Sequence, residues 1–350
     1  MRTACIVLAV ICAIAEAGDA GANSLSWTKL PSIPDKEGFA GTFAGTSGEY
    51  LLVAGGANFP DKKPWESGTK VWHDSVFALK SPEGAWKSVG RLPRPAAYGV
   101  SLSVPGGILC AGGGDARQHF TDVFLLQMHG DELRHTPLPA LPRPCAFMSG
   151  ALVGSTVFVC GGIETPDATQ ALQTLWALDL SAAKREWKEL EPCPGAGRML
   201  ASAGSDAESF FLFSGVALKA GADGKPVREY LRDAWSYRSG AGWRRLPDLP
   251  RAAAAAPSPA PSVIDTQLLI LGGDDGTRVD FKPQQDHPGF NTTVLVFDTR
   301  ALGWTSAGNV PFSRVTVPAV RWSGGIVIPN GEARPGVRSP EVWFGRFLVR

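Results

Sequence analysis

The chain has 350 residues, of which 44% are hydrophobic and 19% charged, and its formal net charge is +1. This balance gives no reason to expect a nucleic acid or an anionic membrane as a partner. The 41 glycines and 28 prolines are typical of a β-rich protein with many turns.

The first element in the chain is an export signal. An arginine precedes an apolar run over residues 4–15, and the sequence A-E-A at residues 15–17 matches an A-x-A cleavage site. We predict a signal peptide over residues 1–17 and one domain over residues 18–350. The mature protein is therefore expected to be periplasmic or secreted, and the apolar run is too short for a good membrane anchor.

Beyond this segment, six apolar runs each end in a doublet of small residues. The doublets are Gly55-Gly56, Gly112-Gly113, Gly161-Gly162, Ser214-Gly215, Gly272-Gly273 and Asn330-Gly331. Their second residues lie 57, 49, 53, 58 and 58 residues apart. A period of about 50 with a glycine pair is typical of kelch repeats, each of which forms one four-stranded blade. We predict an all-β fold, a six-bladed kelch-type β-propeller.

The outer strand of each blade and the closure of the ring can also be predicted. A tryptophan precedes a proline-containing linker at five of the six outer-strand positions, and the third position keeps the linker alone: Trp27, Trp86, Trp187, Trp243 and Trp304. These tryptophans are expected to pack in the core. The last blade reaches its third strand near residues 341–349, one strand short. We predict that the N-terminal strand at residues 26–29 supplies the missing strand and closes the ring.

Four cysteines remain after the signal peptide: Cys110, Cys145, Cys160 and Cys193. In an exported protein such cysteines can form disulfides. Cys110 and Cys160, however, occupy equivalent positions before two doublets, which favours buried free thiols. A bond between Cys145 and Cys160 is left open. The sequence has none of the usual spacings of metal ligands, such as CxxC or HExxH, so we expect no metal site.

The loops that follow the second strands are long, whereas the opposite turns are short. These loops cover residues 57–72, 114–119, 163–170, 216–229, 274–290 and 332–339. Long loops on one face of a rigid scaffold mark the binding side. Phe59 and Trp65 are expected to pack the first loop.

Several polar residues on these loops are candidates for contact with a ligand. Arg117, His119 and His287 are candidate substrate contacts, and each can equally be a solvated loop residue. Asp274 and Asp275 directly follow a doublet and are expected to cap a turn rather than to react.

The sixth repeat differs from the others because Glu332 and Arg338 follow its doublet. A carboxylate supplies general acid–base chemistry, and a guanidinium can clamp a substrate carboxylate through two parallel hydrogen bonds. A plain salt bridge between the two side chains is the alternative. Their spacing alone leaves both interpretations open.

The stretch NGEARPGVRSPEVW at residues 330–343 resembles the NGE-[AV]-[KR]-PG-[LV]-R motif of the bacterial N-acetylneuraminate epimerases, the sialic-acid mutarotases. The segments WTKLPSIPDKEGFAGTFAG, LLVAGGANF and AYGVSLSV carry the resemblance through the first two blades, and at the level of blades it covers the whole mature chain. With its motif at the C-terminus, the sequence is most similar to the circularly permuted branch of this kelch-repeat mutarotase family. Permutation is compatible with a propeller because every blade keeps its neighbours.

The resemblance implies an isomerase that interconverts the α- and β-anomers of N-acetylneuraminate without a cofactor. Its partner would be a small sugar acid. By motif, Glu332 is the implied acid–base residue, Arg338 its partner in the site, and Arg334 the basic position between them. One departure is Ala97, which stands where some members have a basic residue.

Three other functions compete with this one. A non-catalytic kelch propeller that binds a glycan or a protein is compatible with the fold, and it would make Glu332 dispensable. A sialidase is disfavoured because the sequence has no S-x-D-x-G-x-[TS]-W box. A copper oxidase needs paired tyrosine and histidine ligands, and the chain has only four tyrosines.

Overall fold

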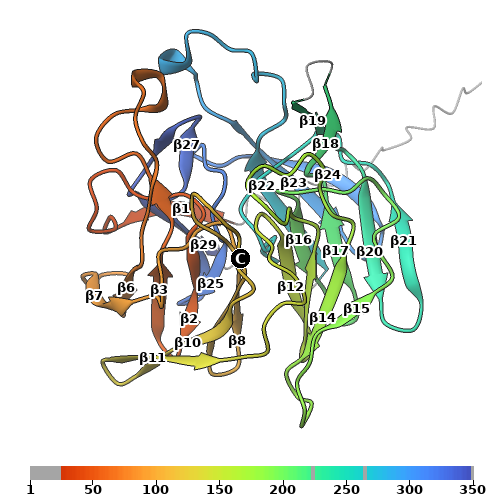
Figure 1. Ribbon diagram of the computed structural model, residues 1–350, viewed down its shortest axis with the longest axis horizontal. Coiled ribbons are helices and arrows are strands. Elements are labelled where there is room, and N and C mark those ends of the chain that lie inside the picture. The colour runs from red at the N-terminus through yellow and green to blue at the C-terminus, as the bar shows by residue number, and fades with distance from the viewer. Residues whose placement is uncertain (1–24, 222–224, 263–265, 348–350) are drawn as a thin grey trace, which may run out of the picture.

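The computed structural model describes residues 25–221, 225–262 and 266–347. Within these ranges, the main strands form six sheets around a central channel, the blades of a β-propeller (Figure 1). This confirms the predicted all-β propeller. No helix in these ranges is long and apolar enough to cross a membrane. The predicted signal peptide at residues 1–17 lies outside the described residues.

Each blade is an antiparallel sheet that runs outward from the channel. The first blade comprises β2 (Phe43–Ser47), β3 (Tyr50–Ala54), β6 (Ser75–Leu79) and β7 (Lys87–Arg91). The second comprises β8 (Val100–Val104), β9 (Gly107–Ala111), β10 (Val123–His129) and β11 (Glu132–Pro137). The third comprises β12 (Ser149–Val153), β13 (Thr156–Cys160), β14 (Leu175–Asp179) and β15 (Lys188–Leu190).

The second half of the ring repeats this arrangement. The fourth blade comprises β16 (Ser202–Ser205), β17 (Phe210–Phe213), β20 (Ala234–Arg238) and β21 (Gly242–Leu246). The fifth comprises β22 (Gln267–Gly273), β23 (Asn291–Asp298) and β24 (Gly303–Asn309), and Ser262 bridges Leu268 at its inner edge. The sixth comprises β25 (Val320–Trp322), β26 (Gly325–Pro329), β29 (Val342–Phe347) and β1 (Leu25–Leu30).

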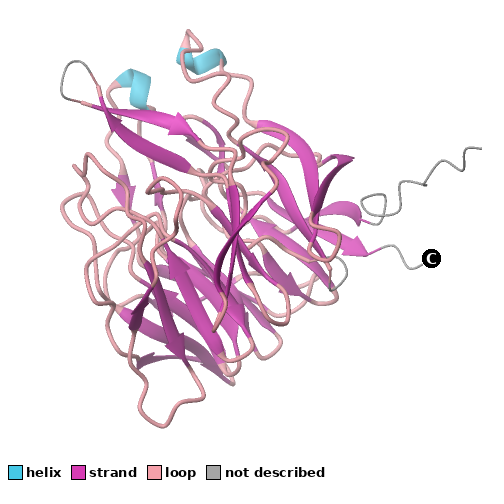
Figure 2. Cartoon of the chain, turned by 90° about the vertical axis from the view of Figure 1, so that its right-hand side faces the viewer, coloured by secondary structure: helices cyan, strands magenta, loops and turns pink. Residues whose placement is uncertain are grey.

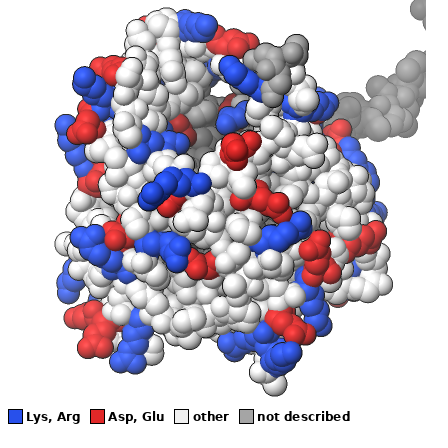
Figure 3. Space-filling model, in the orientation of Figure 1, with Lys and Arg blue, Asp and Glu red and all other residues white. Residues whose placement is uncertain are grey.

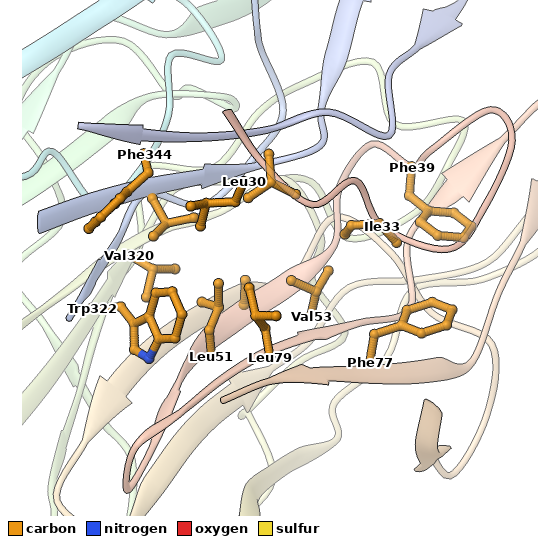
Figure 4. Close-up of a cluster of buried hydrophobic side chains, with 13 residues drawn as sticks. Leu30, Ile33, Phe39, Leu51, Val53, Phe77, Leu79, Val320, Trp322 and Phe344 are labelled. Atoms are coloured by element: carbon orange, nitrogen blue, oxygen red, sulfur yellow. The ribbon is translucent and has the colours of Figure 1, made fainter. Parts of the chain in front are cut away.

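The sixth blade joins the two ends of the described chain, as predicted. β1 pairs with β29 in antiparallel register, with Leu25 opposite Phe347 and Leu30 opposite Val342. Side chains of this blade and of the first blade then share one apolar cluster, in which Leu30 and Phe344 face Leu51 and Leu79 (Figure 4). The ring is thus closed by strand pairing and by burial of apolar surface.

The outer-strand tryptophans link neighbouring blades. Four of the five donate through the indole nitrogen to a carbonyl of the linker that precedes their blade: Trp86 to Pro31 at 2.7 Å, Trp187 to Pro139 at 2.8 Å, Trp243 to Glu191 at 2.8 Å and Trp304 to Pro247 at 3.0 Å. Their rings also pack against the apolar clusters between the blades. The tryptophans are therefore structural, in agreement with the sequence interpretation.

The doublets contain glycine because their backbone is left-handed and crowded. Gly55 and Gly56 have φ of +62° and +97°. A Cβ atom at Gly55 would lie 2.5 Å from the carbonyl oxygen of Ala96, and one at Gly56 would lie 2.6 Å from the side chain of Thr42. Asn330, the first member of the sixth doublet, keeps the same conformation with φ of +64°, which asparagine tolerates better than most residues.

A second set of left-handed residues forms a closed ring around the channel mouth. Each blade contributes one residue with φ between +52° and +68°: Gly41, Tyr98, Phe147, Leu200, Ala255 and Thr316. The amide of each donates to the carbonyl of the one before it, and Gly41 donates to Thr316, with N···O distances of 2.7 to 3.0 Å. We call this closed set the hydrogen-bonded ring. These backbone hydrogen bonds link all six blades around the mouth of the channel.

The long loops lie on one side of the blades. They carry the 3₁₀ helices Pro64–Glu66 and Gln284–Asp286 and three hairpins: β4 (Ala57–Asn58) with β5 (Val71–Trp72), β18 (Val216–Ala220) with β19 (Pro226–Tyr230), and β27 (Glu332–Arg334) with β28 (Val337–Arg338). Figure 2 shows both helices and the β18–β19 hairpin rising at the same end of the molecule. The loops therefore gather where the sequence places the binding side.

All four cysteines of the described residues are buried free thiols. Burial raises the pKa of the Cys110 and Cys160 thiols above the usual value, so both stay protonated at neutral pH. The predicted buried thiols are thus present, and the disulfide left open between Cys145 and Cys160 is not formed.

Candidate functional site

The long loops line a cavity of about 330 Å³ above the hydrogen-bonded ring. Five side chains of that ring form its floor: Tyr98, Phe147, Leu200, Ala255 and Thr316. Its walls come from the loops of the first, fourth, fifth and sixth blades. Cavities of about 300 to 1,000 Å³ are typical of small-molecule sites.

Glu332 and Arg338 meet in the wall of this cavity. They are paired across the β27–β28 hairpin, and Nη1 of Arg338 lies 3.0 Å from Oε1 of Glu332. The amide of Gly336 donates to the same oxygen at 2.8 Å. Among the described residues, Oε2 receives no hydrogen bond. One oxygen of Glu332 is therefore held in place, and the other is available to a ligand.

The guanidinium of Arg338 is occupied on several sides. Besides Glu332, its Nε and Nη2 make long contacts of 3.4 Å with the Ala57 carbonyl and the Tyr98 hydroxyl. Its central carbon lies 4.9 Å from the ring centroid of Phe59, and the side chain is only 3% exposed. Of the two interpretations left open by the sequence, the salt bridge is present, and this geometry does not favour a two-pronged clamp on a substrate.

The turn between Glu332 and Arg338 depends on Gly336. Its φ is +80°, and its amide is one of the two donors to Glu332. A Cβ atom there would lie 2.8 Å from Cγ of Pro64. The turn is thus packed directly against the first-blade loop, which carries Phe59.

We expect Gly336→Ala to displace the donor that orients Glu332, because the added methyl group meets Pro64, and to lower at least about tenfold any activity that depends on this carboxylate. Gly324→Ala is the matched control, since Gly324 has φ of +75° and nothing within 4 Å of the added Cβ. Gly324→Ala should lose about 1 kcal/mol of stability through backbone strain alone, and Gly336→Ala should lose more because its Cβ also meets the Pro64 ring. Kinetics and urea denaturation of the two proteins test this, and equal activity in both would contradict it.

The wall that belongs to the fourth and fifth blades carries a second polar pair. The hydroxyl of Tyr230 donates to Oδ2 of Asp274 at 2.8 Å, and the amide of Gly276 donates to Oδ1 at 3.0 Å. Burial and the neighbouring Asp274 raise the pKa of Tyr230 to about 12, so its phenol stays protonated at neutral pH. Asp274 therefore caps a turn, as expected, and also lines the cavity.

Several residues that line the cavity, Tyr98, Lys70 and Arg228 among them, are not among the catalytic residues and substrate contacts predicted from the sequence. Tyr98 lies within the quoted segment AYGVSLSV, but its left-handed φ of +64° leaves no sequence signal in a non-glycine residue. Lys70 and Arg228 also line the cavity. They lie on predicted long loops, and only the fold places them with Glu332.

Four predicted substrate contacts lie outside the lining of this cavity. Arg117 is exposed on a turn capped by Asp115. Arg334 donates to the Gln285 carbonyl at 2.7 Å and so holds the neighbouring loop. Their contact with a substrate remains a prediction that the geometry does not favour.

The two histidines among these four residues are buried and packed. Nδ1 of His119 lies 2.9 Å from the Ile163 carbonyl, and its ring contacts Phe147. His287 accepts a hydrogen bond from the Gly289 amide at 3.0 Å, and its ring lies between Phe281 and Phe290. Each histidine thus supports a loop or a ring that surrounds the site.

Burial lowers the pKa of His119 below its usual value, and we expect a matching dependence of stability on pH. The unfolded chain binds the proton more readily, so stability is fully present above about pH 6.5 and falls as the pH drops below it. Urea denaturation at pH 7.5 and 5.5 should show a lower free energy of unfolding at pH 5.5. His119→Gln should reduce this difference, and a difference unchanged by the substitution would contradict the assignment.

Charges of both signs are interspersed over the face shown in Figure 3. Within the described ranges, no group of three or more His, Cys, Asp or Glu side chains is arranged to hold a metal ion. The polar groups of the cavity itself are of mixed charge, with Glu332 and Asp274 opposed by Lys70, Arg228 and Arg338. Such a lining suits a ligand that is polar and carries a negative charge.

The chain is similar in sequence to N-acetylneuraminate epimerases. A family model with that description matches residues 10–134. The epimerase of Brucella suis (strain ATCC 23445 / NCTC 10510) is 38% identical over 126 residues, which cover 31% of each chain. That of Vibrio vulnificus (strain YJ016) is 39% identical over 123 residues, or 31% of this chain and 32% of the relative. That of Haemophilus influenzae (strain 86-028NP) is 35% identical over 127 residues, or 32% and 33%.

The chain thus spans about a third of the length of the curated relatives it matches. A solved structure titled "Structure of YjhT" covers 88% of this chain and 94% of its own, with a TM-score of 0.65 and 15% sequence identity. At that identity the likeness shows the fold alone. Sequence similarity is therefore found over residues 10–134, a shorter range than the resemblance suggested, and Glu332 lies beyond it.

Proposed function

We propose that the protein is an isomerase, a mutarotase that interconverts the α- and β-anomers of N-acetylneuraminate. The observation that carries the proposal is the oriented carboxylate of Glu332 in the wall of the cavity. The similarity to N-acetylneuraminate epimerases over residues 10–134 supports the choice of substrate.

Interconversion of the anomers requires ring opening and closure, and proton transfers are enough to catalyse both steps. A base removes the proton of the anomeric hydroxyl, the bond from the anomeric carbon to the ring oxygen breaks, and the ring oxygen gains a proton. In the open form the C2 carbonyl and its carboxylate turn together about the C2–C3 bond. The ring then closes on the other face of the carbonyl. Glu332 serves as proton acceptor and then as donor, and it works through Oε2 because Oε1 is held by Arg338 and Gly336.

The test is proton NMR of the α-anomer freshly released by a sialidase, recorded with and without the protein. The axial and equatorial H3 signals report the conversion of α to β directly. A faster approach to the same equilibrium ratio is the expected result. An unchanged rate with folded protein would overturn the proposal and favour a propeller that binds a glycan or a protein without reaction.

We also propose that the protein acts in the periplasm or outside the cell. The N-terminal sequence with its A-E-A segment at residues 15–17 supports this. The intact mass of the protein from a periplasmic fraction should correspond to a chain that begins at Gly18, and a full-length mass confined to the cytoplasm would contradict it.

A further inference from the structure

Lys70 is surrounded by aromatic rings at the edge of the cavity. Its ammonium nitrogen lies 5.7 Å from the ring centroid of Phe59, 5.6 Å from that of Trp72 and 5.5 Å from that of Tyr98. Rings within about 6 Å attract a cation through their negative faces. Three rings from the first two blades therefore fix the position of one charge in the cavity wall.

This ammonium has no carboxylate partner among the described residues, whereas Lys63 on the same loop is paired with Glu37. An ammonium group has three hydrogen-bond donors, and aromatic faces accept none of them as strongly as an anion does. Lys70 also lines the cavity. Its unused donors are thus available to an anionic ligand in that cavity.

Arg338 is less suited to hold such an anion. Its Nη1 is bound to Glu332 at 3.0 Å, and its side chain is 3% exposed. A carboxylate that took both of its terminal nitrogens would compete with Glu332 for them and would release the group that performs the proton transfer. The ion pair therefore makes Arg338 a positioning residue for Glu332.

We propose that Lys70 is the anchor for the substrate carboxylate, and that this contact selects sugar acids over neutral sugars. The identity of the substrate rests on the proposed function. In a 2-keto sugar acid the carboxylate is bonded directly to the anomeric carbon, so its anchor must lie beside the acid–base group. Lys70 and Arg338 share two aromatic neighbours, Phe59 and Tyr98. Because Arg338 is bonded to Glu332, Lys70 lies on the same side of the cavity as the acid–base group.

The experiment compares Lys70→Met and Lys70→Arg with the wild-type protein. Methionine keeps the apolar length of the side chain against the rings but removes the charge, and arginine keeps the charge. Lys87→Met on the exposed strand β7 is the matched control. Calorimetry gives the Kd of N-acetylneuraminate and of its methyl ester for each protein, and NMR gives KM and kcat.

We expect Lys70→Met to raise Kd and KM for the acid about 10- to 100-fold, because a charge-assisted hydrogen bond is lost, with a much smaller change in kcat. Lys70→Arg should recover part of this loss. The methyl ester should bind the wild-type protein and Lys70→Met equally weakly. Unchanged acid binding in Lys70→Met would overturn the proposal. Equal weakening of acid and ester would also overturn it, since that result indicates packing alone.

The binding measurement separates this inference from the proposed function. If the wild-type protein does not accelerate mutarotation but its affinity for the acid depends on the charge of Lys70, the anchor stands and the reaction is wrong. If the wild-type protein is active and the affinity does not depend on that charge, the reaction stands and the anchor is wrong. Melting temperatures of all variants confirm that each protein is folded.

Discussion

Glu332→Gln is expected to slow mutarotation by about 100-fold or more, because an amide cannot accept and return the proton that the reaction requires. The amide oxygen can still accept from Gly336 and Arg338, so the hairpin should keep its shape. The rate of α-to-β conversion by NMR and the affinity for the sugar acid by calorimetry are the two measurements. The rate should fall far more than the affinity.

Glu83→Gln is the control for this substitution, since Glu83 is 76% exposed and makes only a peripheral ion pair with Arg346. It should leave the rate unchanged. If Glu332→Gln is as active as the control, the acid–base group lies elsewhere. Asp274 would then be the next residue to test, because it lines the same cavity and is oriented by Tyr230.

Asp233→Ala is expected to destabilise the fold by about 3 to 5 kcal/mol, the usual penalty for leaving a buried charge without its partner. Arg198 is 1% exposed and forms two parallel hydrogen bonds with Asp233, at 2.7 and 2.6 Å. Arg198 lies in the linker that enters the fourth blade, and Asp233 directly precedes β20. The pair therefore joins these two segments. Urea denaturation of the purified proteins measures the loss.

The contrast is with an exposed pair. Glu132→Ala should change stability by less than about 0.5 kcal/mol, because Glu132 and its partner Arg134 are 77% and 60% exposed. The double variant Arg198→Met/Asp233→Ala should regain part of the stability lost in Asp233→Ala, since it removes the unpaired charge. A double variant that is even less stable would show that packing of Arg198, rather than its charge, is what matters.

The fold was predictable because the same local sequence patterns recur in almost every blade. Each doublet encodes a left-handed turn and a close approach of two backbones, as at Gly55 and Gly56, and each outer-strand tryptophan marks the end of a blade. Even closure by the N-terminal strand follows from counting strands. A pattern that recurs at a fixed period needs no knowledge of distant contacts.

The site was predictable only where its residues are neighbours in sequence. Glu332 and Arg338 share one hairpin, so their ion pair could be anticipated. Tyr98, by contrast, reaches Arg338 from 240 positions away. Lys70 belongs to a long loop with no motif, and a periodic pattern predicts where such a loop starts but not the direction of its side chains.

The same reason explains why His119 and Arg117 do not line the cavity. Both lie on a loop of the binding side, as expected. The structure then directs His119 toward the Ile163 carbonyl and Arg117 toward solvent. Composition indicates which loops carry polar groups, whereas only packing decides whether those groups face the cavity.

The hydrogen-bonded ring determines what the bottom of the cavity can offer a ligand. Its six amides and six carbonyls are satisfied by one another, and their bond dipoles run head to tail around the channel, so that they largely cancel. The floor therefore presents neither a cluster of free amides for an oxyanion nor a net backbone field along the axis. Charge recognition and proton transfer are left to the side chains of the walls, and loop substitutions can change substrate preference without altering the framework beneath.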